Sequence, residues 1–522
     1  MTTSVAEHVA RNARKFPSRT ALIDDKGTFT YARLDDAANR LAAYLGKSGI
    51  GHGDKVALLA MSSANWVVAY VAILKLRAVC VPLNYRLTPD DIRANVEDAQ
   101  CRLMITTSDY LHSHVHGRID LPTVLIDDSP GESALARILQ EPAAGFHAPQ
   151  ASDDDVQLIM FTGGTTGRSK GVVLRNRQVF WNTIHEALDT GMNEFDNTIL
   201  ATPLHHAAAL NCWLLPHLYL GARATIMTEY SAERMLDLIA AHKVTNGFAP
   251  PSVARELCIA AERHAPERLA SFRRWYVGGG ILSAKDRDRM YALVPGSKIF
   301  YQYGLTEAGV IVTVLKEEDY ETAPDSIGRP FLNFEVKIAR EDLSDASIGE
   351  SGEILVRGPS VMDGYYNRPD ATAAVFHDGW LRTGDMGAMD EKGYVYFHDR
   401  LKDMVKSGGL NVYSQEVERA LQKHPAVREV GVIGLPSERW GEEVTAVVVC
   451  RDGMSVGESE IIAFAKECLA SYKAPKRVVF ISYAELPINY SGKIIKRELR
   501  GKIGRMLEAD GAAPGSMAKN KG

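Results

Sequence analysis

The chain has few of the features that would place it in a membrane, outside the cell or on a metal. Its longest apolar run, Trp66 to Leu74, is broken by Lys75 and Arg77 and is far shorter than the ~20 residues that a spanning helix needs. The six cysteines form no CxxC or other metal-ligand spacing, which is typical of reduced thiols in a cytosolic protein. Residues 1–7 lack a basic stretch leading into an apolar one, so they do not resemble a secretory signal. The sequence therefore predicts a cytoplasmic protein without a transmembrane segment.

No charge of one sign dominates the chain. The net charge is −5, with acidic and basic residues interspersed, which predicts no broad basic face and no nucleic-acid partner. The 522 residues are 46% apolar and 24% charged, as in a soluble globular protein. This length exceeds what one hydrophobic core usually serves, so two or three domains are expected.

The first part of the chain alternates between strand and helix patterns. Residues 4–7, Ser-Val-Ala-Glu, predict a capping box that opens an amphipathic helix. Residues 55–61 form a short apolar run typical of a buried strand, the apolar stretch from Trp66 predicts a buried helix, and residues 78–82 predict another strand. This alternation predicts an α/β fold with largely parallel sheets.

The pattern changes from about Gly349. Glycine-bounded β-like runs at 352–357 and 393–397 precede strands expected at 427–433 and 443–449 and a helix expected at 459–469. We therefore predict a large N-terminal domain at 1–399, a hinge at 400–403, a small α+β domain at 404–507 and a disordered tail at 508–522.

A loop of glycines and hydroxyls is the most informative segment. An apolar strand, residues 156–161, runs into Thr-Gly-Gly-Thr-Thr-Gly-Arg-Ser-Lys-Gly at 162–171. Glycines let backbone N–H groups approach phosphate oxygens closely, Thr165 and Thr166 can donate hydrogen bonds, and Lys170 supplies positive charge. The spacing is not that of a Walker A loop. Composition alone leaves a phosphate site and a flexible surface loop equally open.

This loop resembles the phosphate-binding signature of the adenylate-forming superfamily, which includes acyl-CoA synthetases, firefly luciferase and the adenylation domains of peptide synthetases. The usual pattern is [YF]-T-S-G-[ST]-T-G-x-P-K-G, and this chain has Gly163 for Ser and Ser169 for Pro. The first change removes a hydroxyl donor, and the second gives up some loop rigidity. The resemblance implies that the loop binds the phosphates of ATP and that Thr165 assists at the metal.

Six further segments match the same superfamily in its order. Residues 301–308, Tyr-Gln-Tyr-Gly-Leu-Thr-Glu-Ala, resemble the Y-G-x-T-E motif. By that resemblance Tyr303 stacks on adenine, Thr306 bonds the α-phosphate and Glu307 holds Mg²⁺, a hard cation that takes carboxylate and phosphate oxygens. Pro-Leu-His-His at 203–206 resembles P-L-x-H, which implies that His206 lies where the acid meets the nucleotide; alone, it would more simply be a structural histidine.

Two segments resemble the ribose site and the hinge. Residues 380–385 resemble W-x-x-T-G-D, which implies that Asp385 accepts hydrogen bonds from both ribose hydroxyls. Residues 398–403 resemble the hinge, with Arg400 toward ribose and phosphate and Lys402 at the pivot. Asp399 stands where Gly is usual. The resemblance implies that the small domain is mobile about this pivot.

The last two matches concern the thiol and the catalytic lysine. Residues 406–413 resemble the loop that lines the pantetheine tunnel, although Leu410 and Ser414 replace the commoner Glu and Pro. Residues 486–493 resemble P-x-x-x-S-G-K, which implies that Lys493 is the catalytic lysine of adenylation. The resemblance thus covers nearly the whole chain and implies ATP, Mg²⁺ and coenzyme A as the cofactors and co-substrates.

The resemblance assigns four groups of residues. The catalytic residues are Lys493, Thr306, Glu307 and His206. The nucleotide would contact Thr162, Gly163, Gly164, Thr165, Thr166, Gly167, Lys170, Gly279, Gly280, Gln302, Tyr303, Gly304, Thr306, Asp385, Phe397, Arg400 and Lys493. Coenzyme A would contact Lys406, Ser407, Gly408 and Gly409, and the acid His206, Ala207, Asn211, Gly278, Gly279, Gly304, Val310 and Thr313.

The acid pocket is expected to be roomy and apolar. Small residues at 207–209 and 278–280 suggest space for a bulky acid, and no arginine or lysine stands in these segments to fix a second carboxylate. An apolar monoacid is therefore expected, with fatty, aryl and polycyclic acids open. The competing interpretation of the glycines is close backbone packing.

Several alternatives to a coenzyme A ligase stay open at this point. An adenylating enzyme could load a carrier-protein thiol, although no carrier domain follows Lys493. A luciferase-like oxygenase would need a special substrate, and an unrelated α/β ATPase is disfavoured by the Walker A spacing. A non-catalytic nucleotide-binding regulator is disfavoured because the residues expected at the site are all present, namely Thr306, Glu307, Asp385, Arg400 and Lys493. The sequence leaves the oligomeric state open, a homodimer included.

Overall fold

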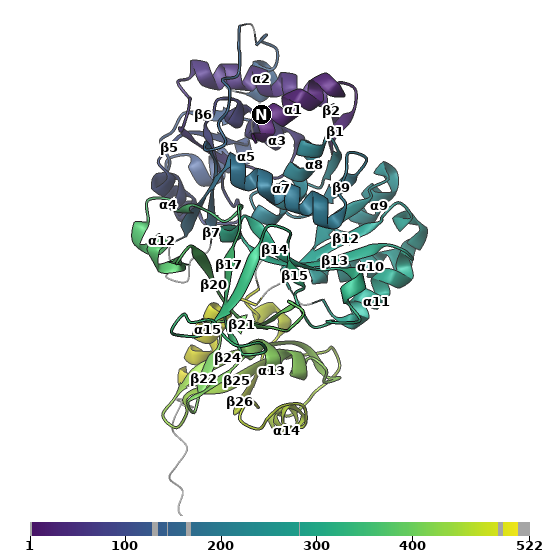
Figure 1. Cartoon of the computed structure of the whole chain (residues 1–522), viewed down its shortest axis with the longest axis vertical. Helices are drawn as coiled ribbons and strands as arrows, with labels where there is room; N and C mark the ends of the chain where they lie inside the picture. The colour runs from purple at the N-terminus through teal and green to yellow at the C-terminus, as the bar shows by residue number, and fades with distance from the viewer. Residues whose placement is uncertain are drawn as a thin grey trace, which may run out of the picture. The chain divides into compact units, whose positions relative to one another are not determined.

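A computed structural model describes residues 3–127, 134–143, 145–162, 169–280, 282–488 and 494–509 (Figure 1). The chain forms two compact units, residues 1–336 with 356–381 and residues 337–355 with 382–522. The predicted α/β class, with a large N-terminal domain and a small C-terminal one, is confirmed. The predicted hinge at 400–403 stays a prediction.

The first sheet of the large unit carries the predicted phosphate loop. Its strand order is β18-β8-β7-β4-β3-β5-β6, and β7, β4, β3, β5 and β6 run parallel. β7 and β8 form an antiparallel hairpin whose connecting loop is the glycine-rich segment. The strands are β3 (Lys55–Leu59), β4 (Val79–Pro82), β5 (Cys101–Thr106), β6 (Thr123–Leu125), β7 (Val156–Thr162), β8 (Lys170–Arg175) and β18 (Gly364–Tyr365).

The second sheet of the large unit carries the Y-G-x-T-E motif. Its order is β15-β14-β13-β12-β11-β9-β10-β1-β2, with a parallel centre from β13 to β1. The strands are β1 (Thr20–Asp24), β2 (Gly27–Thr30), β9 (Asn197–Leu200), β10 (Arg223–Ile226), β11 (Asn246–Ala249), β12 (Arg274–Gly278), β13 (Lys298–Leu305), β14 (Val310–Leu315) and β15 (Arg329–Pro330).

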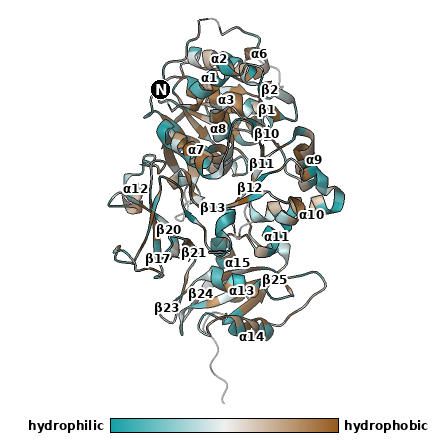
Figure 2. Ribbon diagram, turned by 45° about the vertical axis from the view of Figure 1, so that its right-hand side comes forward, coloured by the Kyte–Doolittle hydropathy of each residue, from teal (hydrophilic) through white to brown (hydrophobic). Residues whose placement is uncertain are grey.

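The helices of the large unit explain the apolar run. α3 (Ala64–Lys75) contacts strands of both sheets as well as α2 (Tyr31–Lys47), and it is buried along nearly its whole length. A helix surrounded in this way has apolar residues on every side, and α3 is largely brown in Figure 2. Other helices are α1 (Val5–Lys15), α4 (Pro89–Ala99), α7 (Asn176–Thr190), α8 (Leu215–Leu220), α9 (Ala232–His242), α10 (Pro251–His264) and α11 (Ala284–Leu293).

The predicted capping box at the start of α1 is wrong, although the helix begins where expected. Ser4 is the N-cap but makes no side-chain capping bond. Glu7 instead accepts a hydrogen bond from the backbone N–H of Ala151 at 2.9 Å. A distant segment therefore replaces the local partner that the spacing suggested.

The small unit has the predicted α+β pattern. Its main sheet runs β23-β22-β25-β24, with β26 on β25. These strands are β22 (Val405–Ser407), β23 (Leu410–Val412), β24 (Val427–Ser437), β25 (Gly441–Cys450) and β26 (Arg477–Phe480), with helices α13 (Ser414–Leu421), α14 (Glu458–Cys468) and α15 (Lys496–Ala509). The strands and helix predicted at 427–433, 443–449 and 459–469 are confirmed.

Further strands occur between β15 and β22 in the sequence. They are β16 (Glu335–Ala339), β17 (Gly352–Arg357), β19 (Phe376–His377), β20 (Trp380–Met389) and β21 (Val395–Arg400). α15 continues through Ala509, past the predicted start of the tail, and residues 510–522 of that tail lie outside the described residues. Within the described ranges, no helix is long and apolar enough to cross a membrane.

Candidate functional site

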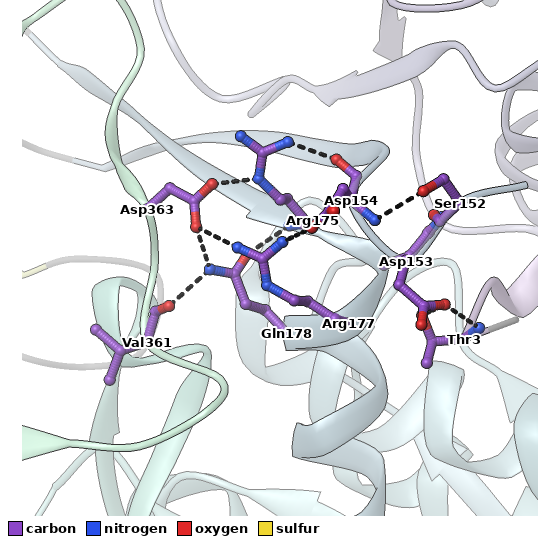
Figure 3. Close-up of polar contacts among 10 residues, drawn as sticks. Thr3, Ser152, Asp153, Asp154, Arg175, Arg177, Gln178, Val361 and Asp363 are labelled. Carbon is purple, nitrogen blue, oxygen red and sulfur yellow. Dashed lines mark hydrogen bonds and ion pairs between the residues drawn. The ribbon is translucent and has the colours of Figure 1, made fainter.

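Polar and charged side chains fix the end of the β7–β8 hairpin that lies away from its connecting segment (Figure 3). Arg175, at the end of β8, pairs with Asp363 and also donates to the backbone oxygen of Asp154. Gln178 donates to Asp363 at 2.8 Å and to the backbone oxygen of Val361 at 2.7 Å. These contacts hold the hairpin against the segment that leads into β18.

The opposite end of the hairpin brings predicted site residues together. Thr162, the last residue of β7, pairs with Lys170 in the strand register. The Thr162 hydroxyl donates to Glu307 Oε1 at 3.4 Å. Residues 163–168, which include Gly163, Gly164, Thr165, Thr166 and Gly167, lie outside the described residues. Thr162, which directly precedes these residues, therefore lies beside the carboxylate expected to hold Mg²⁺.

Tyr365 completes this group and was not predicted from the sequence. Its hydroxyl donates to Glu307 Oε1 at 3.0 Å, and the Lys170 ammonium lies 4.9 Å from the centre of its ring. Burial raises the pKa of Tyr365, and the negative charge of Glu307 raises it further. Tyr365 is therefore a hydroxyl donor at neutral pH. It follows a glycine in a two-residue strand, β18, for which no spacing pattern gave a signal.

The residues around Glu307 suit a hard cation that is shared with phosphates. Among the residues the structure describes, no three His, Cys, Asp or Glu side chains gather into a complete metal site. Mg²⁺ commonly takes one or two protein carboxylates and completes its shell with waters and phosphate oxygens. Glu307, beside the Thr162 hydroxyl, fits that mode of binding.

We expect Tyr365→Phe to weaken MgATP use without unfolding the protein. Because the hydroxyl orients the Glu307 carboxylate, its loss should lower kcat/KM for MgATP about tenfold and raise the Mg²⁺ concentration required. The matched control is Tyr366→Phe, whose hydroxyl instead contacts Gln100 at 3.2 Å. Pyrophosphate release measured against Mg²⁺ concentration tests this; equal Mg²⁺ dependence in the two variants would show that Tyr365 does not act through Glu307.

The strand β13 places the rest of the Y-G-x-T-E motif. Tyr303 is half-buried, and Thr306 and Glu307 lie in a single 3₁₀ turn (Thr306–Ala308) directly after the strand. At Gly304 a Cβ atom would come within 1.7 Å of the backbone oxygen of Val310, so only glycine fits there. Val310 itself has φ 135°, a strained backbone for a β-branched residue and one that often marks a functional segment.

The sequence left two interpretations open for the glycines at 278–280, room for the acid and close backbone packing. The three glycines differ in which interpretation their surroundings support. A Cβ at Gly278 would approach the backbone oxygen of Gln302 to 2.7 Å, so this glycine allows close strand packing. Gly279 has φ +77° and nothing within 4 Å of an added Cβ, and a Cβ at Gly280 would contact Pro251 at 3.3 Å. Open space is therefore found at Gly279, whereas Gly278 and Gly304 serve packing. Ile281 lies outside the described residues.

The predicted histidine is a neutral side chain. Burial lowers the pKa of His206 to about 3, and the charge of Arg86 adds to the effect. The neighbouring His205 is also buried, and the two ring centres are 4.1 Å apart. A neutral imidazole can exchange hydrogen bonds with a carboxylate or a phosphate but cannot supply a positive charge at pH 7.

Four further predicted acid-pocket residues are buried, whereas Gly279 and Gly304 are exposed. Ala207, Asn211, Val310 and Thr313 all have little or no exposed surface. The Thr313 hydroxyl donates to the backbone oxygen of Ile327 at 2.6 Å, so its polar group is already satisfied. Asn211 differs, because its side-chain oxygen has no hydrogen-bond partner within the described chain.

Sequence reasoning missed a buried carboxyl beside Gln302. Glu186, on α7, accepts hydrogen bonds from Gln302 Nε2 at 3.1 and 3.4 Å and is fully buried. Desolvation raises its pKa to about 8, the Gln302 bond opposes the rise, and the charge of Asp189 adds to it. No local motif marks Glu186, since its partner lies far along the chain.

This carboxyl should make stability depend on pH. The native state keeps the Glu186 proton up to a pH of about 8, whereas the unfolded chain releases it near 4.5. Its contribution is therefore fully present below about pH 4.5 and is lost as the pH rises toward 8. The unfolding free energy of Glu186→Gln, taken relative to that of the wild type at the same pH, should therefore rise by about 2 kcal/mol between pH 6 and pH 8.

Urea unfolding of both proteins at a series of pH values tests this difference. The other ionisable groups that face Glu186, namely Asp189, Cys212 and Tyr276, are present in both proteins, so the comparison isolates the change at position 186. A difference that stays constant across this range would mean that Glu186 is already ionised in the folded protein.

The small unit places the predicted ribose residues on neighbouring strands. Asp385 on β20 is opposite Arg400 on β21, and Arg400 Nε is 3.8 Å from Asp385 Oδ1. Phe397 lies on the same strand as Arg400. Lys402 follows in a turn, where burial lowers its pKa and the Arg400 charge lowers it further. A carboxylate can accept a hydrogen bond from a ribose hydroxyl, and the guanidinium beside it can bind a phosphate.

Two departures from the superfamily pattern form one contact. Ser414 donates both its backbone N–H and its hydroxyl to Asp399 Oδ2, the hydroxyl at 2.6 Å. Lys496 donates to the Ser414 hydroxyl and pairs with Glu418 at 2.8 Å. Proline at 414 would have no N–H to give, and glycine at 399 would have no acceptor. The two replacements are therefore complementary.

The predicted coenzyme A loop is the turn of a β-hairpin. β22 and β23 are joined by Gly408 and Gly409, with φ 60° and 79°, the backbone of a tight two-residue hairpin turn. Gly408 donates to the backbone oxygen of Trp440 at 2.8 Å. Lys406 is exposed and Ser407 buried. Their contact with coenzyme A stays a prediction, and Lys493 lies outside the described residues.

Comparison with known proteins gives matches over nearly the whole chain. The profile of the AMP-binding enzyme family matches residues 9–366, and the profile of the AMP-binding enzyme C-terminal domain matches residues 416–493. A feruloyl-CoA synthase of an Amycolatopsis species is 34% identical, over 95% of this chain and 98% of that protein. A long-chain-fatty-acid–CoA ligase of Mycobacterium tuberculosis is 35% identical, over 90% and 92%.

Solved structures agree with these matches. The o-succinylbenzoate CoA synthetase of Bacillus subtilis, in complex with its acyl-adenylate intermediate, is 31% identical with a TM-score of 0.84, over 94% of this chain and 97% of that chain. ATP-bound MatB of Rhodopseudomonas palustris is 27% identical with a TM-score of 0.86, over 96% and 99%.

Proposed function

The chain belongs to the AMP-binding enzyme family and is an acid–thiol ligase, and we propose that it joins an apolar carboxylic acid to coenzyme A through an acyl-adenylate. The observation that carries this proposal is the meeting of Thr162, Lys170, Glu307 and Tyr365 where the glycine-rich loop leaves and rejoins its sheet. That arrangement suits the phosphates of ATP and one hard cation.

The first step activates the acid. A carboxylate oxygen attacks the α-phosphorus of ATP, the bond to the β-phosphate breaks, and pyrophosphate leaves with the electron pair. Two anions meet in this step, so positive charge must neutralise them. Lys170 and Lys493 are the proposed cations, and Thr306 is a proposed hydrogen-bond donor to the α-phosphate. Mg²⁺ on Glu307, when bound, draws charge from the phosphate oxygens.

The second step makes the thioester. The sulfur of coenzyme A attacks the carbonyl carbon, AMP leaves with the electron pair, and the thiol proton is lost to solvent or to AMP. In this step the hairpin turn at Gly408 and Gly409 is proposed to lie along the pantetheine chain, and Asp385 with Arg400 to hold the AMP ribose. We propose that the small C-terminal domain rotates about Lys402 between the two steps.

The substrate class follows from the buried pocket residues and the relatives. Ala207, Val310 and the open space at Gly279 offer an apolar surface. Relatives act on ferulate, long-chain fatty acids and a polycyclic propanoate. We propose an apolar monoacid in one of these classes, with ATP, Mg²⁺ and coenzyme A as co-substrates, a cytoplasmic location and a homodimeric state.

Incubation of the full chain with MgATP, coenzyme A and a panel of fatty, aryl and polycyclic acids tests the proposal. Mass spectrometry should detect AMP together with one class of acyl-CoA. Pyrophosphate and bound acyl-AMP without acyl-CoA would point to a carrier-protein thiol as the acceptor. No acid-dependent use of ATP across the panel would contradict the ligase and favour a nucleotide-binding regulator.

A further inference from the structure

Four buried polar side chains gather behind the strand that carries the Y-G-x-T-E motif. They are Asn182 and Glu186 on α7, Asn211 on the π-helix η2 (Ala208–Leu214) and Gln302 on β13, here called the polar cluster, and each is at most 2% exposed. Most side chains at this depth are apolar. Four amide and carboxyl groups in one place therefore need an explanation.

The members of the polar cluster are connected. Asn182 and Glu186 are four residues apart on α7 and so lie on one face of that helix. Asn182 Nδ2 donates to the backbone oxygen of Asn211 at 2.9 Å and lies 3.8 Å from Cys212 Sγ. Gln302 Nε2 donates to Glu186 at 3.1 Å. Helix α7 thus contacts η2 through Asn182 and β13 through Glu186.

The polar cluster is not satisfied by the protein. Asn182 Oδ1, Asn211 Oδ1 and Gln302 Oε1 are buried and have no hydrogen-bond partner within the described parts of the chain. Rotating an amide would exchange its free oxygen for a free N–H and leave a partner missing. Each buried polar atom without a partner is unfavourable, and such atoms are few in folded proteins. Something outside the chain is expected to bond them.

The neutral form of Glu186 adds a donor to these acceptors. With its pKa raised by burial to about 8, the carboxyl holds its proton at pH 7. Within the described residues, the Glu186 carboxyl oxygens are hydrogen-bonded only to Gln302, so the direction away from Gln302 is left for that O–H. The cluster thus offers one O–H donor and three amide oxygens.

The polar cluster borders the predicted acid pocket. Asn211 belongs to both. Gln302 is opposite Gly278 in the sheet register and stands two residues before Gly304 on β13. The free amide oxygens therefore belong to side chains in or next to the segments expected to line the acid pocket.

We propose that the polar cluster binds a hydroxyl group on the distal part of the acid, so that the substrate is a phenolic or otherwise hydroxylated acid rather than a plain fatty acid. This inference rests on the proposed function. A hydroxyl donates one hydrogen bond and accepts others, so it can donate to an amide oxygen of the cluster and accept from Glu186. A second carboxylate would meet acceptors and no cation. A distal amine is the chemical rival, because it would pair with an ionised Glu186.

Pairs of acids that differ in one group test the inference. The full-length enzyme is assayed for pyrophosphate release with 3-(4-hydroxyphenyl)propanoate, 3-phenylpropanoate and 3-(4-aminomethylphenyl)propanoate, and with hexadecanoate and its 16-hydroxy derivative. A site built to bond a hydroxyl rejects the analogue that lacks it. At least one hydroxy acid should exceed its deoxy partner in kcat/KM by about 10²-fold or more.

Variants of the polar cluster identify which side chains bind the substrate hydroxyl. Asn182→Leu with Glu186→Leu should bring the two kcat/KM values within about threefold of each other, whereas Glu186→Gln, which keeps a hydrogen-bonding group, should retain most of the preference. The control is Asn246→Leu, since Asn246 is equally buried but lies on β11 beside His217. It should lower stability and leave the preference unchanged. Circular dichroism melting confirms that each variant is folded.

The outcomes separate this inference from the proposed function. Pyrophosphate release at equal rates with hydroxy and deoxy acids would mean that water fills the polar cluster, which overturns the inference and leaves the ligase standing. A preference for the amine would also overturn it. Failure of every acid to release pyrophosphate would overturn the proposed function and this inference with it.

Discussion

Lys493→Ala should lower the rate of acyl-adenylate formation by about 10³-fold and leave thioester formation from supplied acyl-adenylate within about threefold of the wild type. The lysine is expected to neutralise charge as the carboxylate and the α-phosphate meet, and to fix their geometry. The thiol attack that follows joins a thiolate to a neutral carbonyl group and does not need that charge. The two half-reactions should therefore separate cleanly.

The measurement uses each half-reaction by itself. Exchange of pyrophosphate into ATP reports adenylation, and a single turnover of synthetic acyl-adenylate with coenzyme A reports transfer. The matched control is Lys502→Ala on α15, which removes a lysine whose partner is Glu485 on the surface and should leave both rates unchanged. Loss of both rates in Lys493→Ala would contradict the separation of roles.

The sequence predicted those parts of the site that depend on neighbours along the chain. Thr306 and Glu307 follow a strand within one motif, and Thr162 and Lys170 pair across one hairpin, so the nearness within each pair could be inferred from local order. Parallel strands in an α/β fold also bring their carboxyl ends to one edge. These placements need no knowledge of distant contacts.

Tyr365 and Glu186 could not be predicted in that way. Tyr365 reaches Glu307 from another sheet, and Glu186 reaches Gln302 from a helix. Pairs of this kind depend on how the sheets and helices pack, and a single sequence does not record it. A tyrosine or a glutamate outside a motif looks like any half-buried or surface residue.

The glycines show that one residue type can serve either of two purposes. For the glycines at 278–280 the sequence left room for the acid and close backbone packing both open, and a Cβ at Gly278 or at Gly304 would strike a backbone oxygen. Gly408 and Gly409 were expected to let a thin chain pass, and their positive φ values show that they also form a hairpin turn. Glycine is needed in each case, for a reason the sequence leaves ambiguous.

Asp399→Ala should destabilise the small unit by about 3 kcal/mol. Asp399 is fully buried and accepts both the N–H and the hydroxyl of Ser414. Its removal leaves a buried N–H without a partner. It also removes the nearby negative charge that, with Glu418, balances Lys496. Burial raises the pKa of Glu418 and Lys496 opposes that rise, so the group is sensitive to any change in its charges.

Hydrogen exchange of backbone amides in β24 and β25, measured on the full chain by mass spectrometry, reports the stability of this unit directly. Asp452→Ala is the control, because Asp452 is exposed and its pair with Arg428 spans 3.8 Å; its exchange should match the wild type.

Ser414→Ala and the double variant complete a double-mutant cycle with Asp399→Ala, in which a coupling of about 2 kcal/mol is expected. Independent effects of the two single variants would mean that Asp399 and Ser414 replace Gly and Pro separately. A strong coupling would mean that each replacement is favourable only with the other, so that a buried polar contact stands in this chain where the superfamily has a glycine beside the predicted hinge.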